Sequence, residues 1–342
     1  MPSAQTVYFT GARELDVRAE AVSEPEPNEV LVRAEVSAIS PGTELLVYRG
    51  EAPKELAADA TIDALSGTLD FPLKYGYATA GTVTAIGENV SDDWMGESVF
   101  AFYPHASHFL ASTTDLIRIP DGVASADAVF LPTVETAVNF ALDGAPRIGE
   151  QVVVFGQGLV GLLTTGLLAD YPLADLVTLD CYSERREHSR EMGADCCLDA
   201  THDTREAIEA ALSRAETPSG ADLTYELSGN PSALDDAVAV TGYDGRVLVG
   251  SWYGEKRAEL NLGGSFHRSR IDIESTQVST LAPELRGRWD SDRRLDVAWR
   301  RLAALDVARL VTHRISIGEA HDAYRLLDEH PNEAVAVLLT YD

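Results

Sequence analysis

The chain has 342 residues, longer than a typical single domain, so we expect two domains that share one cleft. Its formal net charge at pH 7 is -28, because 55 acidic residues face 27 basic ones, of which only three are lysines. Such a surface argues against nucleic acid or an anionic membrane as a partner, since both carry negative charge. It is typical of adaptation to high salt, and an ordinary acidic enzyme is the alternative.

The cysteines and the N-terminal segment indicate a reducing compartment. Cys181, Cys196 and Cys197 contain no C-x-x-C pair, and no basic segment followed by an apolar run opens the chain. We therefore expect plain thiols in a cytoplasmic protein. An apolar window at residues 159–168 is interrupted by glycine and threonine and followed by Asp170, so no membrane span is expected.

The first part of the chain is rich in short strands. Alternating apolar residues and glycine punctuation predict strands at residues 5–9, 29–36, 74–87 and 97–110. A short helix is expected within residues 37–50. Close spacing of these segments predicts a small, curved antiparallel barrel. Residues 126–142 then predict a helical hinge.

A strand followed by a glycine-rich turn stands at the centre of the sequence. Residues 152–155 are apolar and mostly β-branched, as in a buried parallel strand, and a G-x-G-x-x-G turn follows directly. Its residues are Gly156, Gln157, Gly158, Leu159, Val160 and Gly161. The first glycine permits the turn, the second lets the backbone approach a pyrophosphate, and the third lets the helix pack closely. A flavodoxin-like turn without a dinucleotide is the alternative.

An acidic residue stands at the spacing that a dinucleotide site requires. The next strand, residues 176–179, ends at Asp180, about 20 residues beyond the glycines, where a carboxylate binds the ribose hydroxyls of NAD. Its charge would repel a 2′-phosphate. NAD is therefore expected, with NADP possible because Ser183, Arg185 and Arg186 follow shortly after.

The α/β alternation continues to the end of the chain and predicts a doubly wound parallel sheet. Helices are expected at residues 183–192, 205–215, 295–305 and 320–327, with strands at 222–226, 246–250 and 334–339. Small residues at the strand ends border the ligand in such sheets. We therefore add Ser228, Gly250 and Ser251 to the expected cofactor contacts.

The order of parts resembles the medium-chain dehydrogenase/reductase superfamily, the relatives of alcohol dehydrogenase and quinone reductase. Segments similar to the family's signatures are residues 41–50, 76–87, 226–234 and 311–324. The resemblance implies an α/β protein with a GroES-like β-barrel catalytic domain and a Rossmann domain. The expected domains are residues 1–135, completed by 276–342, and residues 136–275, with hydride transfer in the cleft.

The zinc ligands of this family are missing. Pro41 replaces the cysteine, Tyr77 stands at the histidine position, and Pro132 falls at the third-ligand position. These side chains do not make the tetrahedral nitrogen and sulfur site of zinc, so no catalytic zinc is expected. His105 and His108 offer a residual metal site, but residues three apart on a strand face opposite sides.

Catalysis without zinc needs a proton donor at the substrate oxygen. The resemblance places four candidates in the catalytic cleft: Thr43, Tyr77, Glu135 and Thr136, the last two beneath the nicotinamide. Tyr77 is the first choice, as a phenol of depressed pKa that polarises a carbonyl, and cavity filling is its alternative. His105 is a further acid/base candidate. We expect two neighbours to be structural, Glu44 paired with an arginine and Tyr48 packed.

Residues 40–44 and 264–270 resemble a zinc-free branch that includes the bacteriochlorophyllide hydroxyethyl dehydrogenases, which oxidise a secondary alcohol. The leading hypothesis is therefore a zinc-independent, NAD(H)-dependent enzyme that interconverts an alcohol and a ketone or aldehyde. An NADPH-dependent quinone or enoyl reductase and a non-catalytic dinucleotide-binding protein are the alternatives. Residues 271–281 form a β-branched run at the expected sheet edge, which predicts a homodimer.

Overall fold

The computed structural model describes residues 3–59, 61–62, 64–201, 204–212 and 220–341. The chain forms two compact units, the first made of Met1–Pro132 and Asp306–Asp342 and the second of Thr133–Leu305. Within the described ranges, no helix carries an apolar stretch long enough to cross a membrane.

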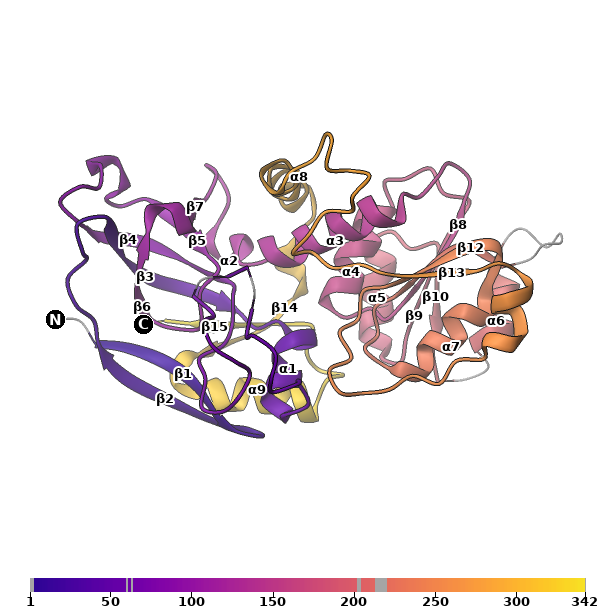
Figure 1. Ribbon diagram of the computed structural model, residues 1–342, viewed down its shortest axis with the longest axis horizontal. Helices are drawn as coiled ribbons and strands as arrows, with labels where there is room; N and C mark the ends of the chain where they lie inside the picture. The colour runs from indigo at the N-terminus through magenta and orange to yellow at the C-terminus, as the bar shows by residue number, and fades with distance from the viewer. Residues whose placement is uncertain (1–2, 60, 63, 202–203, 213–219, 342) are drawn as a thin grey trace. The chain divides into compact units, whose positions relative to one another are not determined.

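The second unit is built on a sheet of six parallel strands in the order β10-β9-β8-β11-β12-β13 (Figure 1). The strands are β8 (Gln151–Phe155), β9 (Asp175–Asp180), β10 (Cys196–Asp199), β11 (Ala221–Glu226), β12 (Thr241–Val249) and β13 (Asp272–Ser275). The order reverses beside β8, so the ends of β8 and β11 form the switch point where doubly wound sheets bind ligands. The predicted Rossmann sheet is confirmed.

Helices cover both faces of this sheet. They are α3 (Leu131–Gly144), α4 (Leu159–Leu168), α5 (Ser183–Glu191), α6 (Thr204–Ala211), α7 (Pro231–Val240) and α8 (Ser291–Ala304), with a π-helical turn at Leu262–Phe266. Successive strand residues face opposite sides, since Val153 packs in one core with Ile208 of α6 while Val154 packs in another with Leu168 of α4. All four side chains are fully buried.

The first unit contains a two-stranded ribbon and a seven-stranded sheet of order β14-β15-β3-β4-β5-β7 with β6 beside β3. The strands are β1 (Ser3–Gly11), β2 (Glu14–Ala21), β3 (Glu29–Ala38), β4 (Thr79–Ile86), β5 (Ser98–Ala101), β6 (His108–Ser112), β7 (Leu116–Arg118), β14 (Val311–Ser316) and β15 (Ala336–Thr340). One edge of β3 pairs with β4. The other edge pairs with β6 along residues 29–33 and with β15 along residues 36–38. Strands from near both ends of the sequence therefore lie in one sheet.

Short helices complete the first unit. They are α1 (Pro41–Arg49), α2 (Ser125–Ala128) and α9 (Ala320–Glu329), with single 3-10 turns at Asp92–Trp94, Thr113–Asp115, Val307–Leu310 and Ile317–Glu319. Helices α1 and α9 pack on each other through aromatic rings, because Tyr324 contacts Phe9 at 5.3 Å and Tyr48 at 5.4 Å between ring centroids. Tyr48 is buried, so the expectation that it packs is confirmed.

Two predicted elements are each divided into two separate elements in the structure. Residues 97–110 form β5 and β6 rather than one strand, because residues 105–107 leave this sheet and hydrogen-bond to β1 instead. The helix expected at 126–142 is divided into α2 and α3. Pro132 lies in the first turn of α3, and proline lacks the amide hydrogen that a continuous helix needs there. The predicted helix 205–215 begins as expected, but its last three residues lie outside the described residues.

The boundary near the C-terminal part differs from the expected one. Residues 276–305 belong to the second unit, whereas they were expected in the catalytic domain. Hydrogen bonds hold them there, since Arg294 of α8 binds Glu135 and Asn139 of α3, and Asn139 also donates to Thr276.

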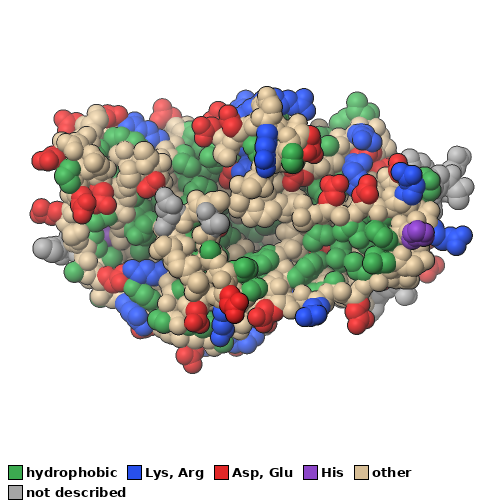
Figure 2. Space-filling view, in the orientation of Figure 1, with side chains coloured by type: hydrophobic (Ala, Val, Ile, Leu, Met, Phe, Trp, Pro, Cys, Tyr) green, Lys and Arg blue, Asp and Glu red, His purple; other side chains and the backbone are tan. Residues whose placement is uncertain are grey.

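The excess of acidic residues is visible on the surface, where carboxylates are scattered over the visible face (Figure 2). Arg13 and Arg49 offset part of this charge by pairing with Asp328 on α9, at 2.7 and 2.5 Å. Adaptation to high salt stays a prediction from composition.

Arg294→Met tests the buried ion pair of the second unit. Its guanidinium is 2.9 Å from Glu135, and both side chains are less than one-tenth exposed. Removing one partner leaves a buried charge, so the free energy of unfolding should fall by about 3–5 kcal/mol. Burial already raises the pKa of Glu135 against the opposing effect of Arg294. In the variant we expect the stability to be greatest at low pH and lost as pH rises through the pKa of the folded carboxyl.

Arg301→Met on the same helix is the control, because its pair with Asp170 is largely exposed and should change stability by less than about 1 kcal/mol. Urea unfolding at fixed salt measures both. Equal losses in the two variants would contradict the assigned role of the buried pair.

Candidate active site

The glycine turn of the second unit brings β8, α4 and β11 into close backbone contact. Gly156 has φ +89°, and a Cβ there would lie 2.5 Å from Ser228 Cα. A Cβ on Gly161 would lie 2.0 Å from the Gly156 carbonyl oxygen. Both positions therefore require glycine, and α4 begins directly against the end of its strand.

Gly158 differs from the other two glycines. It is the N-cap of α4, and the nearest atom to a Cβ built on it is Arg185 Nη1, at 3.9 Å. Packing therefore does not require glycine here. Gly158 therefore leaves space at the N-terminus of α4, and a helix N-terminus suits a phosphate group.

Asp180 lies at the end of β9, where its spacing placed it. It is buried, and its two carboxylate oxygens accept from the backbone amides of Gln157, at 2.7 Å, and Tyr182, at 2.9 Å. Each oxygen keeps a lone pair for a further donor. The carboxylate thus ties the glycine turn to the end of β9.

Two arginines follow Asp180 on α5. Arg186 donates to the carbonyls of Asp180 and Cys181, at 2.9 Å each, and pairs with Asp199. Arg185 lies over the Tyr182 ring, 4.9 Å from its centroid. Only Arg185 approaches the opening in front of the glycine turn.

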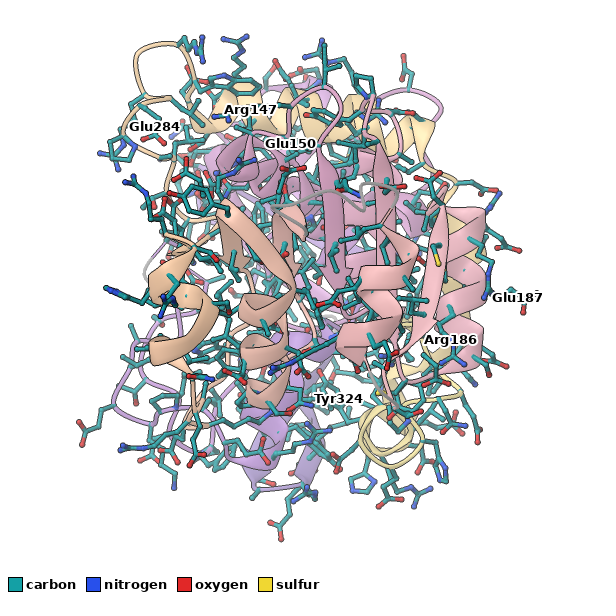
Figure 3. All side chains as sticks on the ribbon, turned by 90° about the vertical axis from the view of Figure 1, so that its right-hand side faces the viewer. Arg147, Glu150, Arg186, Glu187, Glu284 and Tyr324 are labelled. Atoms are coloured by element: carbon teal, nitrogen blue, oxygen red, sulfur yellow. The ribbon has the colours of Figure 1, made fainter. Side chains whose placement is uncertain are left out.

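The other end of the sheet carries a purely structural polar cluster. Glu150 pairs with Arg246 at 2.9 Å and accepts from the Arg147 amide at 2.9 Å. Figure 3 shows Arg147 and Glu150 at one end of the sheet and Arg186 at the opposite end. The carboxyl ends of the strands therefore remain the ligand side of this unit.

The small residues expected at the strand ends have bonding roles. Ser228 donates through its amide to Glu226 at 2.8 Å, and Ser251 Oγ accepts from the Gly229 amide at 2.9 Å. A Cβ on Gly250 would lie 2.4 Å from the Phe140 ring, so Gly250 is needed for packing. The structure thus places all three at the β11 and β12 ends beside the glycine turn.

Glu226 is a buried residue that sequence reasoning used only as part of a family signature. Its carboxylate accepts from Ser228 and from the Tyr253 hydroxyl, which lies 2.5 Å away. Burial and the Glu226 charge raise the pKa of Tyr253. In the sequence, Glu226 could have been recognised as an acidic residue at the end of a predicted strand, shortly before a serine and a glycine.

Glu135 and Thr136, expected beneath the nicotinamide, lie on α3. The Glu135 carboxylate is buried and bonded to Arg294, while Thr136 is half-buried. A carboxylate held in this way is not a ready proton donor. We therefore assign Glu135 to the ion pair and keep Thr136 as a cofactor-contact candidate.

In the first unit, Tyr77 and Thr43 are both half-buried. The Tyr77 hydroxyl donates to Ser40 Oγ at 2.6 Å. Burial, followed by the negative charge of Glu44, raises the pKa of Tyr77 to about 12. The expected depression of this pKa is therefore wrong, because anionic groups and low polarity disfavour the phenolate. Tyr77 stays protonated and acts as a hydrogen-bond donor.

His105 is fully buried, and both ring nitrogens are engaged. Nδ1 lies 2.7 Å from Ser37 Oγ, and Nε2 lies 3.0 Å from Glu44 Oε2. This favours the hydrogen-bonded interpretation of His105 over an acid/base role. His108 lies apart, beside Ser107 at 3.2 Å, so the two histidines do not converge.

Glu44 does not have the arginine partner expected for it. Its carboxylate accepts from His105, from the Tyr324 hydroxyl and from the Ser40 amide, the last at 2.7 Å. The side chain is fully buried. Tyr324 lies on α9, near the C-terminal end of the sequence, so no local pattern could predict that it binds Glu44.

The residues at the family's zinc positions do not fit that metal. Proline offers no ligand at positions 41 and 132, and the tyrosine at 77 is a protonated phenol. Within the described ranges, no group of three or more His, Cys, Asp or Glu side chains is arranged to hold a metal ion. We derive no catalytic step through zinc.

Comparison with known proteins decides the family. The family model described as zinc-binding dehydrogenase matches residues 160–290. D-guloside 3-dehydrogenase of Escherichia coli is 23% identical over 330 residues, covering 92% of this chain and 93% of that protein. The chain belongs to the medium-chain dehydrogenase/reductase superfamily. It is an alcohol oxidoreductase of this superfamily, as the sequence resemblance predicted.

Solved structures share the fold along the whole chain. A short chain alcohol dehydrogenase from Escherichia coli, complexed with NADH, has a TM-score of 0.78 at 20% identity and 99% coverage of both chains. A putative zinc-binding dehydrogenase from Sinorhizobium meliloti, bound to NADP, has a TM-score of 0.78 at 19% identity and 100% coverage of both. The medium-chain dehydrogenase/reductase fold is therefore confirmed.

Paired alanine substitutions test the different roles of the glycines. Gly161→Ala places a Cβ 2.0 Å from a backbone oxygen, so we expect a loss of about 1–3 kcal/mol in unfolding free energy. Gly158→Ala has room, with φ -69° and ψ -176°, so stability should change by less than about 0.5 kcal/mol. Urea unfolding of the ligand-free protein measures both. A strongly destabilised Gly158 variant would contradict the conclusion that the structure has room for a side chain at this position.

Proposed function

We propose that this oxidoreductase binds NAD(H) and interconverts a secondary alcohol and a ketone or aldehyde without zinc. The observation that carries the proposal is the glycine turn, with Asp180 bonded to the Gln157 amide at 2.7 Å and open space before Gly158. A relation to the bacteriochlorophyllide hydroxyethyl dehydrogenases stays a prediction from the sequence.

The chemistry of the turn supports a dinucleotide. The amides at the start of α4 would hold the pyrophosphate, and Arg185, 3.9 Å from a Cβ on Gly158, would add a positive charge beside it. Asp180 would accept from the ribose hydroxyls. Its fixed negative charge favours NAD over NADP, although relatives of this fold are solved with either.

The bound nicotinamide would supply the hydride acceptor or donor. The chain itself must orient the substrate oxygen and manage its proton. Tyr77, protonated and half-buried, is our donor to that oxygen, its proton turning from Ser40 to the substrate, and Thr43 is a second hydroxyl within hydrogen-bonding reach of Tyr77. Tyr77 stands at one of the family's zinc-ligand positions, and Thr43 lies two residues after another. A neutral hydrogen bond to the substrate oxygen would therefore take the place of the positive charge of a metal ion.

A quinone or enoyl reductase is the second candidate. The observation in its favour is the high pKa of Tyr77, about 12, because a conjugated acceptor needs no strong acid at its oxygen. Asp180 disfavours the NADPH that this alternative predicts. A non-catalytic dinucleotide-binding role is the outcome left if nucleotide binds and no substrate class turns over.

We also propose a cytoplasmic homodimer. The three cysteines are free, as expected of a reducing compartment. Strand β13 ends the six-strand order, and its Asp272 and Glu274 side chains are exposed. The strand is shorter than the predicted run 271–281. Sedimentation in high salt should give the mass of two chains, and a single-chain mass at all concentrations would remove this proposal.

Tyr77→Phe tests the proposed donor. We expect kcat/KM for ketone reduction with NADH to fall by about 100-fold, because one hydrogen bond to the developing oxyanion is lost. NADH affinity should stay unchanged, since the cofactor cradle belongs to the second unit. Steady-state kinetics in high salt, with NADH titration by fluorescence, measures both.

Tyr75→Phe is the matched control, a buried tyrosine two residues away whose ring meets Tyr77 edge-on at 6.3 Å. It should keep near-normal kinetics. Wild-type turnover should survive metal chelators. Stoichiometric zinc, activity lost on chelation, or a preference for quinones over ketones would each contradict the proposed reaction.

A further inference from the structure

Five polar side chains form a continuous hydrogen-bonded chain inside the first unit. Tyr341 Oη lies 2.7 Å from Ser37 Oγ, which lies 2.7 Å from His105 Nδ1. His105 Nε2 lies 3.0 Å from Glu44 Oε2, which also accepts from Tyr324. Four of the five have no exposed surface, and Tyr341 is half-buried. The proposed mechanism above uses none of them.

One assignment of donors satisfies every group in this chain of hydrogen bonds. With neutral His105 protonated on Nε2, Tyr341 donates to Ser37, Ser37 donates to Nδ1, and Nε2 donates to Glu44. Glu44 is then an ionised carboxylate that receives three donors, from His105, Tyr324 and the Ser40 amide. A buried carboxylate is tolerated when its oxygens are satisfied in this way.

Ser40 connects this buried charge to Tyr77. It is the N-cap of α1, and its amide donates to Glu44 Oε1 at 2.7 Å, as in a capping box shifted by one residue. Its side-chain oxygen accepts from the Tyr77 hydroxyl at 2.6 Å. One residue therefore fixes the carboxylate through its backbone and the phenol through its side chain.

We propose that Glu44 is a positioning residue for Tyr77, acting through Ser40 to hold the phenol protonated and in place, so that its hydroxyl proton turns from Ser40 to the substrate oxygen when substrate binds. The proposal rests on the proposed function, in which Tyr77 meets the substrate oxygen. The favoured ligand is a neutral carbonyl compound, because its oxygen accepts from the phenol.

The surroundings of Tyr77 agree with this role. Glu44 and Asp59 are the negative groups that raise its pKa together with burial, whereas the Ser40 and Thr43 hydroxyls lower it. Tyr75 contributes a ring edge. Of these groups only Glu44 is buried on the core side, so its charge is the least screened by solvent.

Glu44→Gln and Ser40→Ala should move the Tyr77 pKa in opposite directions. Glutamine removes the charge at constant size, so the pKa should fall by about one unit. Alanine removes a hydroxyl that can donate to the phenolate, so the pKa should rise. NMR titration of ring-labelled tyrosine in the substrate-free protein measures both, with the signal assigned by its loss in Tyr77→Phe. An unchanged pKa in folded Glu44→Gln overturns the proposal.

Tyr324→Phe covers the case in which Glu44→Gln does not fold. It keeps the carboxylate and the ring contacts but removes one donor, so the less stabilised charge should raise the Tyr77 pKa further. Tyr48→Phe is the control, because Tyr48 is a buried tyrosine whose ring packs against Tyr324 at an angle of 37°, and it should leave the Tyr77 pKa unchanged. Equal shifts in the two variants would overturn the proposal, since they would indicate general loosening of the core.

The titration needs neither cofactor nor substrate, so it separates this proposal from the proposed reaction. If Tyr77→Phe keeps full turnover while Glu44→Gln lowers the Tyr77 pKa, the reaction is refuted and the positioning role stands. In active enzyme, Glu44→Gln should also move the alkaline limb of the kcat/KM profile to lower pH, with kcat affected more than KM.

Discussion

The close backbone contact between the end of β8 and the start of α4 constrains the second unit more than any other. A side chain at Gly161 would enter the space of the Gly156 carbonyl, and one at Gly156 would meet the Ser228 backbone. Because these elements touch without side chains, the ends of β8, β9 and β11 converge. Asp180 and Ser228 are brought beside the same turn as a consequence, and the helix amides face the opening at Gly158.

The first unit depends on a different device, a buried carboxylate that receives its donors from distant parts of the chain. Glu44 on α1 meets His105 from the segment before β6 and Tyr324 from α9. The superfamily is known for a metal in this region, but the proline at 41 and the tyrosine at 77 do not offer its ligands. We infer that the hydrogen-bond network of Glu44, rather than a metal ion, positions Tyr77 for the substrate oxygen.

Each unit buries a carboxylate, and the two carboxylates are stabilised by different partners. Arg294 neutralises Glu135 inside the second unit, while Glu44 in the first unit is held by His105, the Tyr324 hydroxyl and the Ser40 amide. An ion pair of the first kind fixes a helix. A buried carboxylate of the second kind also acts on its neighbours: burial, followed by the charge of Glu44, raises the pKa of Tyr77 rather than lowering it.

The sequence alone determined the parallel Rossmann sheet, the glycine turn and the place of Asp180, because these depend on local periodicity and on short, fixed spacings. It also showed that the zinc ligands are absent, since ligand chemistry is a property of residue type. Only the tertiary structure decided the partners of Glu44, Glu135 and His105 and the sign of the Tyr77 shift. The contacts of Glu44 with His105 and Tyr324 and of Glu135 with Arg294 join residues 61 to 280 positions apart, and no local pattern encodes which buried groups will meet.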